Sequence, residues 1–305
     1  MDIKFHIPDF MHHFRLNLTL AEYMRMRPEA FYDNVKIGSV YGTFPDMVWN
    51  GGRFLQGQCD ERVIREIINQ LNKRGIALRF TLTNPMLEVR HISDPYCNKI
   101  LEMADNGLNE AIVFSPMLED HIRSKFPDML LTSSTCKQIE DFDELKKEME
   151  KDYSLVVLDY NFNNDWGLLE ALPRKEKAEL LINPCCHPSC KRRGEHYRSI
   201  GRSQIACSEI HRKNPKIPYQ PEPFSCECMR KTLYQTTDSP LHISPEMLYE
   251  KYVPMGYCNF KIEGRSVPDV NVLENYVYYM VKPEYQNEAR LDMLLMLTKD
   301  IRYFS

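Results

Sequence analysis

Eight short apolar runs, separated by stretches with helical periodicity, constrain the fold of this 305-residue chain more than any other feature. The predicted strands are Ile3–Ile7, Val35–Val40, Ala77–Leu82, Ala111–Phe114, Met129–Thr132, Ser154–Leu158, Leu180–Ile182 and Asn259–Ile262. The predicted helices are Leu20–Phe31, Glu61–Arg74, Pro95–Asn106, Met117–Lys125, Asp141–Lys151 and Val270–Lys282. Strands that alternate with helices form parallel sheets, and eight of them favour a closed (βα)8 barrel. We therefore predict an α/β, TIM-type barrel with residues 1–305 in a single domain.

An open, doubly wound sheet is the alternative architecture. The sequence contains no GxGxxG or GxxxxGKS loop, so a nucleotide-binding sheet of that type lacks its usual motif. Glu61–Arg74 shows the helical pattern best: Val63, Ile64, Ile67, Ile68 and Leu71 recur at helical spacing, and Gly75 follows as a stop signal.

The region from about residue 185 to 257, after the seventh predicted strand, breaks the alternation. It is rich in proline and basic residues, and six of the ten cysteines lie in its first 44 residues: Cys185, Cys186, Cys190, Cys207, Cys226 and Cys228. A structureless loop of this length is unusual in a compact domain. We expect a cysteine-rich insertion at the barrel mouth that is organised by its own ligand.

The crowded thiols predict a metal centre. Cys186 and Cys190 form a Cys-x3-Cys pair, and Cys207 with Cys226 or Cys228 can complete a set of four. Four thiolates suit a 4Fe–4S cluster or tetrahedral zinc. The Cys-x2-Cys knuckles of structural zinc sites are missing, so the spacing favours the cluster, with zinc as the alternative. Cys226 is preferred over Cys228 as the fourth ligand.

Polar residues follow the predicted strands, where α/β barrels carry their catalytic groups. Glu263 and Arg265 come directly after the last strand, and His196 follows the cysteine motif; these three are the candidate catalytic residues. A structural ion pair of Glu263 with Lys261 or Arg265, and a structural His196, are the alternatives. Loop and strand-end positions give the candidate substrate-binding residues Tyr41, Asn50, Arg53, Asn84, Asp159 and Asn183. Caps and turns account for some of such residues in any barrel.

Two segments resemble unclassified-peptidase family 32, the collagenase-like peptidases. One is the string Asn259-Phe-Lys-Ile-Glu-Gly-Arg-Ser, which is similar to the family's Lys-Ile-Glu-Gly-Arg strand; the other is the cysteine region. The resemblance covers roughly residues 1–285. It implies a barrel and, from the family's oxygen-independent hydroxylases, a 4Fe–4S cluster bound by four cysteines, two of them 17 positions apart like Cys190 and Cys207. The spacing of Cys186 departs from that pattern.

Three functions follow from these observations. The leading one is an iron–sulfur oxidoreductase, hydroxylase-like, that acts on a small molecule or a nucleic-acid base at the barrel mouth. In this picture Glu263 orients the substrate or moves a proton, and His196 has a pKa suited to neutral pH. The alternatives are a peptidase, for which Cys185 is the nearest nucleophile, and a non-catalytic, metal-stabilised partner subunit. The resemblance also implies a homo- or hetero-oligomer as one form in which the chain can work.

The location of the chain follows from what its sequence lacks. No apolar run approaches the 18 or so residues of a membrane helix, and residues 1–14 do not have the pattern of a signal peptide. We therefore expect a cytoplasmic protein without a membrane partner. The net charge of −4 argues against a broad nucleic-acid-binding surface.

Overall fold

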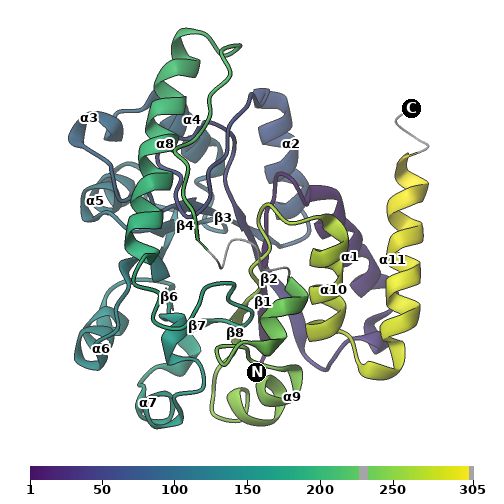
Figure 1. Cartoon of the computed structure of the whole chain (residues 1–305). Helices are drawn as coiled ribbons and strands as arrows, with labels where there is room; N and C mark the ends of the chain where they lie inside the picture. Colours follow the sequence, from purple (N-terminus) through teal and green to yellow (C-terminus); the bar gives the residue numbers. More distant parts are fainter. Residues whose placement is uncertain (227–232, 302–305) are drawn as a thin grey trace.

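The protein folds as a closed barrel of eight parallel strands (Figure 1), in a computed structural model that describes residues 1–226 and 233–301. The strands pair in chain order, and β8 pairs with β1 to close the ring. Their bounds are β1 Ile3–Pro8, β2 Val35–Gly42, β3 Ala77–Leu82, β4 Glu110–Val113, β5 Leu130–Ser133, β6 Leu155–Val157, β7 Ala178–Leu181 and β8 Asn259–Lys261. The predicted (βα)8 fold is thus confirmed, and the open sheet is excluded.

The barrel interior contains a network of buried charges. Arg79 on β3 is fully buried; its Nε lies 3.0 Å from Glu110 Oε2, its Nη1 forms a short contact with Glu179, and its Nη2 donates to Thr132 Oγ1 at 2.9 Å. Lys261 Nζ on β8 lies 3.2 Å from Glu179 Oε1. Two cations therefore face two carboxylates, which is the pairing that buried charges require. β7 begins at Ala178, two residues before the predicted start at Leu180, because the charged Glu179 interrupts the apolar run on which the prediction was based.

Helices surround the barrel. Their bounds are α1 Phe14–Met26, α2 Glu61–Asn72, α3 Val89–Ile92, α4 Pro95–Ala104, α5 Pro116–Lys125, α6 Phe142–Glu150, α7 Trp166–Ala171, α8 Arg193–Lys213, α9 Pro245–Met247, α10 Asp269–Met280 and α11 Gln286–Ile301. Six of these eleven described α-helices overlap predicted ones, whereas α3, α7, α8, α9 and α11 were not predicted. In α2 the residues Ile64, Ile67, Ile68 and Leu71 are buried as predicted, but Val63 is exposed. Asp60 caps the helix by accepting a hydrogen bond from the Arg62 N–H.

The first predicted helix, Leu20–Phe31, is placed too late. The observed α1 begins at Phe14 and ends at Met26, and Pro28 then opens a short 3₁₀ turn, Pro28–Ala30. Proline has no N–H to donate and disfavours the α conformation of the residue before it, so the helix ends before Pro28.

The segment after β7 contains a 21-residue helix, α8, that the sequence did not predict. Figure 1 shows α8 on the same side of the barrel as α3, α4 and α5. Arg90 Nη1 donates to Glu209 Oε1 at 3.1 Å, which ties α3 to α8, and Asn84 Nδ2 donates to the Gly201 carbonyl at 3.2 Å. The expected insertion of residues 185–257 thus contains a regular helix of 21 residues, which packs on the loops after β2 and β3.

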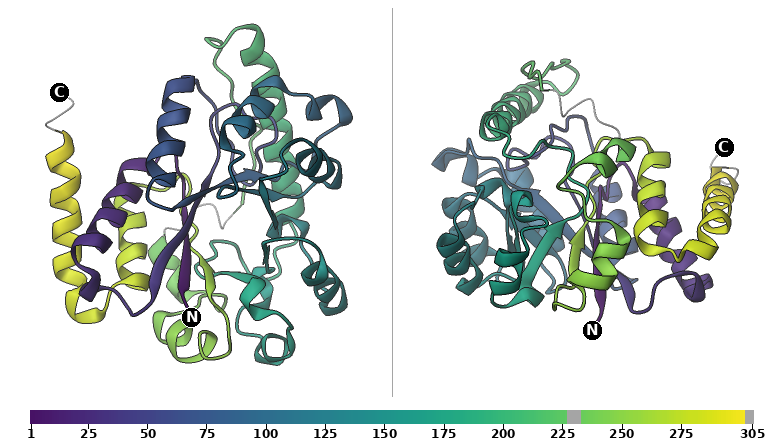
Figure 2. Two further views of the ribbon diagram at one scale, coloured as in Figure 1. Left: turned by 180° about the vertical axis from the view of Figure 1, so that it is seen from behind. Right: turned by 60° about the horizontal axis from the view of Figure 1, so that its bottom comes forward.

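The C-terminal helices complete the outer layer. Figure 2 shows α10 and α11 side by side with α1, on the side of the barrel opposite α8, and the three helices contact one another. Among the helices of residues 1–226 and 233–301, none combines the length and the apolar character that crossing a membrane requires.

Candidate functional site

A pocket of about 100 Å³ lies at the C-terminal mouth of the barrel. This mouth pocket is lined by polar, charged and aromatic residues that come from the strand ends, from the loops after them and from the first turn of α8. They include Tyr41, Arg53, Thr81, Thr83, Cys136, Tyr160, Cys186, His196, Tyr197, Lys261, Glu263 and Arg265. This is the end of the barrel where α/β barrels carry their active sites.

The end of β8 and the residues directly after it supply three charged side chains to the mouth pocket. Lys261, Glu263 and Arg265 alternate along the chain, and all three line the pocket. β8 ends at Lys261, and Glu263 and Arg265 lie in the segment directly after it, Arg265 in a turn. Gly264 lies between them against Pro8, where an added Cβ would come within 2.8 Å of the Pro8 ring.

Glu263 is held in place by three partners. Its carboxylate forms a short ion pair with Arg53 and accepts a hydrogen bond from the Cys185 N–H at 3.0 Å. Its own N–H donates to Asn183 Oδ1 at 2.7 Å. The alternative of a structural ion pair with Lys261 or Arg265 is wrong in its partner: Glu263 pairs with Arg53, which is 210 positions away.

Arg265 has polar partners but no described carboxylate within ion-pair distance. Its Nη1 donates to Thr81 Oγ1 at 2.9 Å, and its guanidinium lies 5.7 Å from the centre of the Tyr41 ring. Among the described residues, no carboxylate lies within 4.0 Å of it. Burial lowers the pKa of Arg265 and the neighbouring Arg53 adds to this effect, whereas the Asp9 carboxylate opposes it. An anion bound in the mouth pocket would supply the charge that Arg265 lacks.

Lys261 is a titratable group that the sequence analysis did not assign to the site. Burial lowers its pKa to about 8, even though Glu179 favours the charged form. Its Nζ lies 4.3 Å from the centre of the Tyr41 ring. A lysine with this pKa exchanges protons near neutral pH, so Lys261 joins the candidate acid–base groups. Its position two residues before Glu263 was the signal available in the sequence.

His196 lines the mouth pocket, but its protonation differs from the prediction. Burial, with a further contribution from Arg53, lowers its pKa to about 4. The ring stacks on Phe224 with centres 4.6 Å apart. At neutral pH His196 is therefore an uncharged hydrogen-bonding group. The pKa near neutrality that we expected from the sequence fails because the site is buried and cationic.

Two of the six candidate substrate-binding residues, Tyr41 and Arg53, line the mouth pocket. The others lie outside its lining and have partners within the protein. Asn50 Nδ2 donates to the Arg53 carbonyl at 2.8 Å and to Gln204 Oε1 at 3.0 Å, and Asn183 holds Glu263.

Asn84 and Asp159 both hold α8 in place. Asn84 Nδ2 donates to the Val48 carbonyl at 2.8 Å as well as to Gly201, and Asp159 forms an ion pair with Arg193 at the start of α8. In this structure Asn50, Asn84, Asp159 and Asn183 position the loops and the helix around the pocket, and their role in substrate binding stays a prediction.

Several lining residues were not predicted from the sequence, because they lie in α8 or in short turns rather than directly at a strand end. Tyr197 comes from α8, Tyr160 from the 3₁₀ turn Tyr160–Phe162 after β6, and Cys136 from the turn Thr135–Lys137 after β5. The guanidinium of Arg193 lies 4.4 Å from the centre of the Tyr160 ring. Aromatic side chains that cover a cationic pocket are recognisable only after the loops are folded.

Four of the five described cysteines of residues 185–257 lie at the mouth pocket or near the start of α8. Cys186 lines the mouth pocket, and Cys185 lies beside Glu263; burial and the Glu263 carboxylate raise the pKa of the Cys185 thiol. Cys190 and Cys226 are partly buried near the start of α8, where Arg192 donates to the carbonyl of Ser225. Cys228 lies outside the described residues.

Cys207 lies apart from these thiols. It is 14 residues beyond Arg193 on α8, which corresponds to about 21 Å along a continuous helix. Its Sγ lies 3.5 Å from Asp46 Oδ1 and 3.7 Å from His211 Nδ1. Within the described part of the chain, Asp46, Cys207 and His211 form the one group of three or more metal-ligating side chains. The structure thus separates Cys207 from Cys186 and Cys190.

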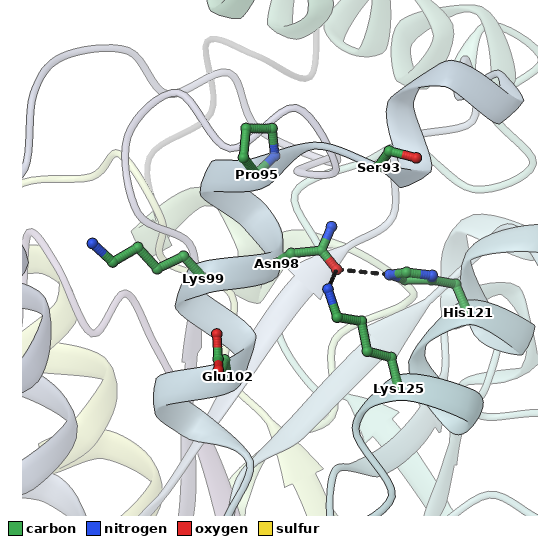
Figure 3. Close-up of a pocket in the computed structure, with 7 residues that line it drawn as sticks. All are labelled: Ser93, Pro95, Asn98, Lys99, Glu102, His121 and Lys125. Carbon is green, nitrogen blue, oxygen red and sulfur yellow. Dashed lines mark hydrogen bonds between the residues drawn. The ribbon is translucent and has the colours of Figure 1, made fainter.

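A second, open hollow of about 580 Å³ lies between α4 and α5 (Figure 3). Asn98 Oδ1 accepts hydrogen bonds there from His121 Nε2 and Lys125 Nζ, both at 2.8 Å. Its polar groups bond to one another on the outer helices, and none of its lining residues belongs to a strand. It is therefore a weaker candidate than the mouth pocket.

Fold and site together define a class: a (βα)8 barrel with a cationic pocket at the C-terminal ends of its strands. No family model and no curated protein matches the sequence. The structure is similar to that of the U32 peptidase Mk0906, with a TM-score of 0.52 over 88% of this chain and 95% of that chain, at 10% identity. At this identity the likeness shows the fold alone. It agrees with the barrel implied by the family resemblance, and neither a peptidase nor a hydroxylase activity follows from it.

Proposed function

We propose that this chain is an enzyme that binds a small anionic substrate at the mouth of its barrel and moves a proton with Glu263 or Lys261. The observation that carries the proposal is Arg265, a guanidinium at the pocket without a carboxylate within 4.0 Å among the described residues. A charge removed from water needs a partner, and a substrate carboxylate or phosphate supplies one. Arg53 provides a second donor at the same pocket.

The two acid–base groups fit different tasks. Glu263 forms an ion pair with Arg53, and a carboxylate in this position can accept a proton from a bound substrate. Lys261, with a pKa of about 8, is mostly protonated at pH 7 and can donate one. His196, uncharged at this pH, can bond to a polar group of the substrate.

The finer prediction is an iron–sulfur oxidoreductase of the hydroxylase type, acting on a small molecule or a nucleic-acid base. In its favour, Cys186 lines the mouth pocket. The set Cys186, Cys190, Cys207 and Cys226 does not fit one cluster in this structure, because α8 carries Cys207 away from Cys190. We therefore derive no chemical step from a cluster, and the 4Fe–4S cofactor stays a prediction that metal analysis can test.

A peptidase is the alternative that the structural neighbour's description suggests for this chain. A cysteine peptidase needs a thiolate activated by a base. Cys185 lies beside a carboxylate, and its thiol pKa is raised by burial and by Glu263, so the thiolate is disfavoured. The geometry therefore supports a small anionic substrate better than peptide cleavage by Cys185.

Calorimetric titration with single small carboxylates, phosphates and nucleotides tests the proposal. We expect one class to bind, and we expect Arg265→Gln to weaken its binding at least tenfold, while Arg265→Lys retains part of it. Arg62→Gln is the matched control, because Arg62 is an exposed arginine at the start of α2 that pairs with Asp60. Absence of binding by every class, or equal binding by wild type and Arg265→Gln, would contradict the proposal.

A further inference from the structure

A second constellation of reactive side chains lies outside the mouth pocket. Cys207 and His211 are four positions apart on α8, so they share one face of the helix, and Asp46 approaches them from the loop after β2. None of the three lines the mouth pocket. Cys207 is fully buried, and the side chains of His211 and Asp46 are only 8% and 16% exposed. The cluster is thus enclosed between α8 and a loop.

The helix and the loop are fixed to each other around this cluster. Gln204, one turn before Cys207, donates from Nε2 to the Leu55 carbonyl at 3.0 Å and accepts from the Leu55 N–H at 3.1 Å. Ser208 donates to the Asp46 carbonyl. These bonds hold the donor atoms near one another without any ligand, which reduces the entropy cost of binding one.

The distances resemble the edges of a metal coordination sphere. Cys207 Sγ lies 3.5 Å from Asp46 Oδ1 and 3.7 Å from His211 Nδ1. Zinc bonds of about 2.3 Å to sulfur and about 2.0 Å to nitrogen or oxygen place tetrahedral ligand atoms about 3.5 Å apart. The third edge, His211 Nδ1 to Asp46 Oδ2, is 2.7 Å and would have to widen slightly.

The two ring nitrogens of His211 each face an oxygen atom. Nε2 lies 3.0 Å from the Ile217 carbonyl, which can only accept, so Nε2 carries a hydrogen. In a neutral ring Nδ1 then has a lone pair, which faces the Asp46 carboxylate at 2.7 Å. Two acceptors so close need a positive species between them: a second ring proton or a metal ion. A backbone carbonyl on the distal nitrogen is also the usual outer partner of a metal-bound histidine.

We propose that Asp46, Cys207 and His211 bind a divalent transition-metal ion of the zinc class. Sulfur, imidazole and carboxylate together suit zinc, whereas magnesium and calcium prefer oxygen ligands alone. Gln56 Oε1, 3.8 Å from Cys207 Sγ, or a water molecule is available for the fourth position. The ion would link α8 to the loop that carries Arg53 into the mouth pocket. The proposal does not depend on the function proposed for that pocket.

Calorimetric titration of chelator-treated protein with Zn²⁺, together with absorption spectra on Co²⁺, tests the site. We expect one Zn²⁺ per chain and a sulfur-to-cobalt charge-transfer band. Both Cys207→Ser and His211→Gln should weaken Zn²⁺ binding at least 100-fold. Cys190→Ser is the matched control, because it removes a thiol of the same segment outside the cluster and should leave binding unchanged.

Asp46→Asn keeps the size of the side chain and covers the case in which a variant of α8 fails to fold. We expect it to weaken Zn²⁺ binding and to remove the rise in melting temperature that Zn²⁺ gives the wild type. No Zn²⁺ binding by the wild type would overturn the proposal. Binding that survives both Cys207→Ser and Asp46→Asn, or that is lost in Cys190→Ser, would also overturn the proposal.

Discussion

The end of β8 and the segment that follows β7 treat sequence neighbours in opposite ways. Lys261, Glu263 and Arg265 lie within five residues, at the end of β8 and in the turn after it, and meet in one pocket. Cys190 and Cys207 lie within 18 residues, yet a continuous helix separates them. Closeness along the chain therefore predicts closeness in space only where the local structure is known. In this protein the end of β8 and the turn after it bring charged side chains together, whereas α8 separates two thiols.

The largest effect should come from the charge network on which the mouth pocket rests. Glu179→Gln leaves Arg79 and Lys261 with one carboxylate fewer in the barrel interior. Removing one partner of a buried ion pair costs about 3–5 kcal/mol, and we expect that loss in urea unfolding. Cys190→Ser, in the metal-free protein, should leave the unfolding midpoint unchanged. Equal midpoints for wild type and Glu179→Gln would show that the network is not what holds the strand ends.

His6 gives the same region a pH dependence. Burial lowers its pKa to about 4, and Arg79 also disfavours the charged form. Glu179 and Glu110 favour the charged form but do not outweigh burial. The unfolded chain, with a pKa near 6.5, binds the proton first as the pH falls, so the free energy of unfolding decreases from about pH 6.5 towards pH 4. The shift corresponds to about 3 kcal/mol for this one group.

Urea unfolding at several pH values between 7.5 and 4.5 measures this effect. His6→Gln should reduce the slope by the contribution of one proton, and His196, whose pKa is also lowered to about 4, should account for part of what remains. An unchanged slope in His6→Gln would show that His6 is protonated in the folded protein.

A smaller effect is expected where α8 packs on the barrel. A Cβ at Gly201 would lie 2.3 Å from Asn84 Oδ1 and 3.0 Å from Met86 Cγ. Gly201→Ala should therefore destabilise the protein by about 1–3 kcal/mol, as overpacking does. Gly194→Ala on the same helix is the matched control: its nearest neighbour would be 3.4 Å away at the end of the Gln138 side chain. We expect Gly194→Ala to be neutral or slightly stabilising. Similar thermal unfolding of the two variants would mean that α8 does not pack on Asn84.

The fold was predictable because its signals are local. All eight strands and six helices carried apolar periodicity, and their alternation is enough to indicate a barrel. Helix α8 was missed because its buried face is made of small and polar residues, such as Arg193, His196, Ser203 and Cys207, rather than of apolar ones. These residues pack on polar loops instead of on the hydrophobic core, so no apolar stripe marks the helix.

The site was predictable only in part, for a related reason. Glu263 and Arg265 follow a strand, and the mouth of a barrel is where such residues gather. The partner of Glu263, Arg53, and the partner of Cys207, Asp46, come from a distant loop, and no spacing in the sequence connects them. The lowered pKa of His196 depends on burial by Phe224 and on Arg53, which only the folded chain brings together.

The separation of Cys190 from Cys207 is tested most directly by metal analysis of protein purified without oxygen. Iron, sulfide and zinc would be measured on the wild type, Cys190→Ser and Cys207→Ser. The structure predicts that the two variants differ: zinc is lost from Cys207→Ser and retained by Cys190→Ser. About four irons and four sulfides per chain, lost from both variants alike, would place both thiols on one cluster and contradict the account.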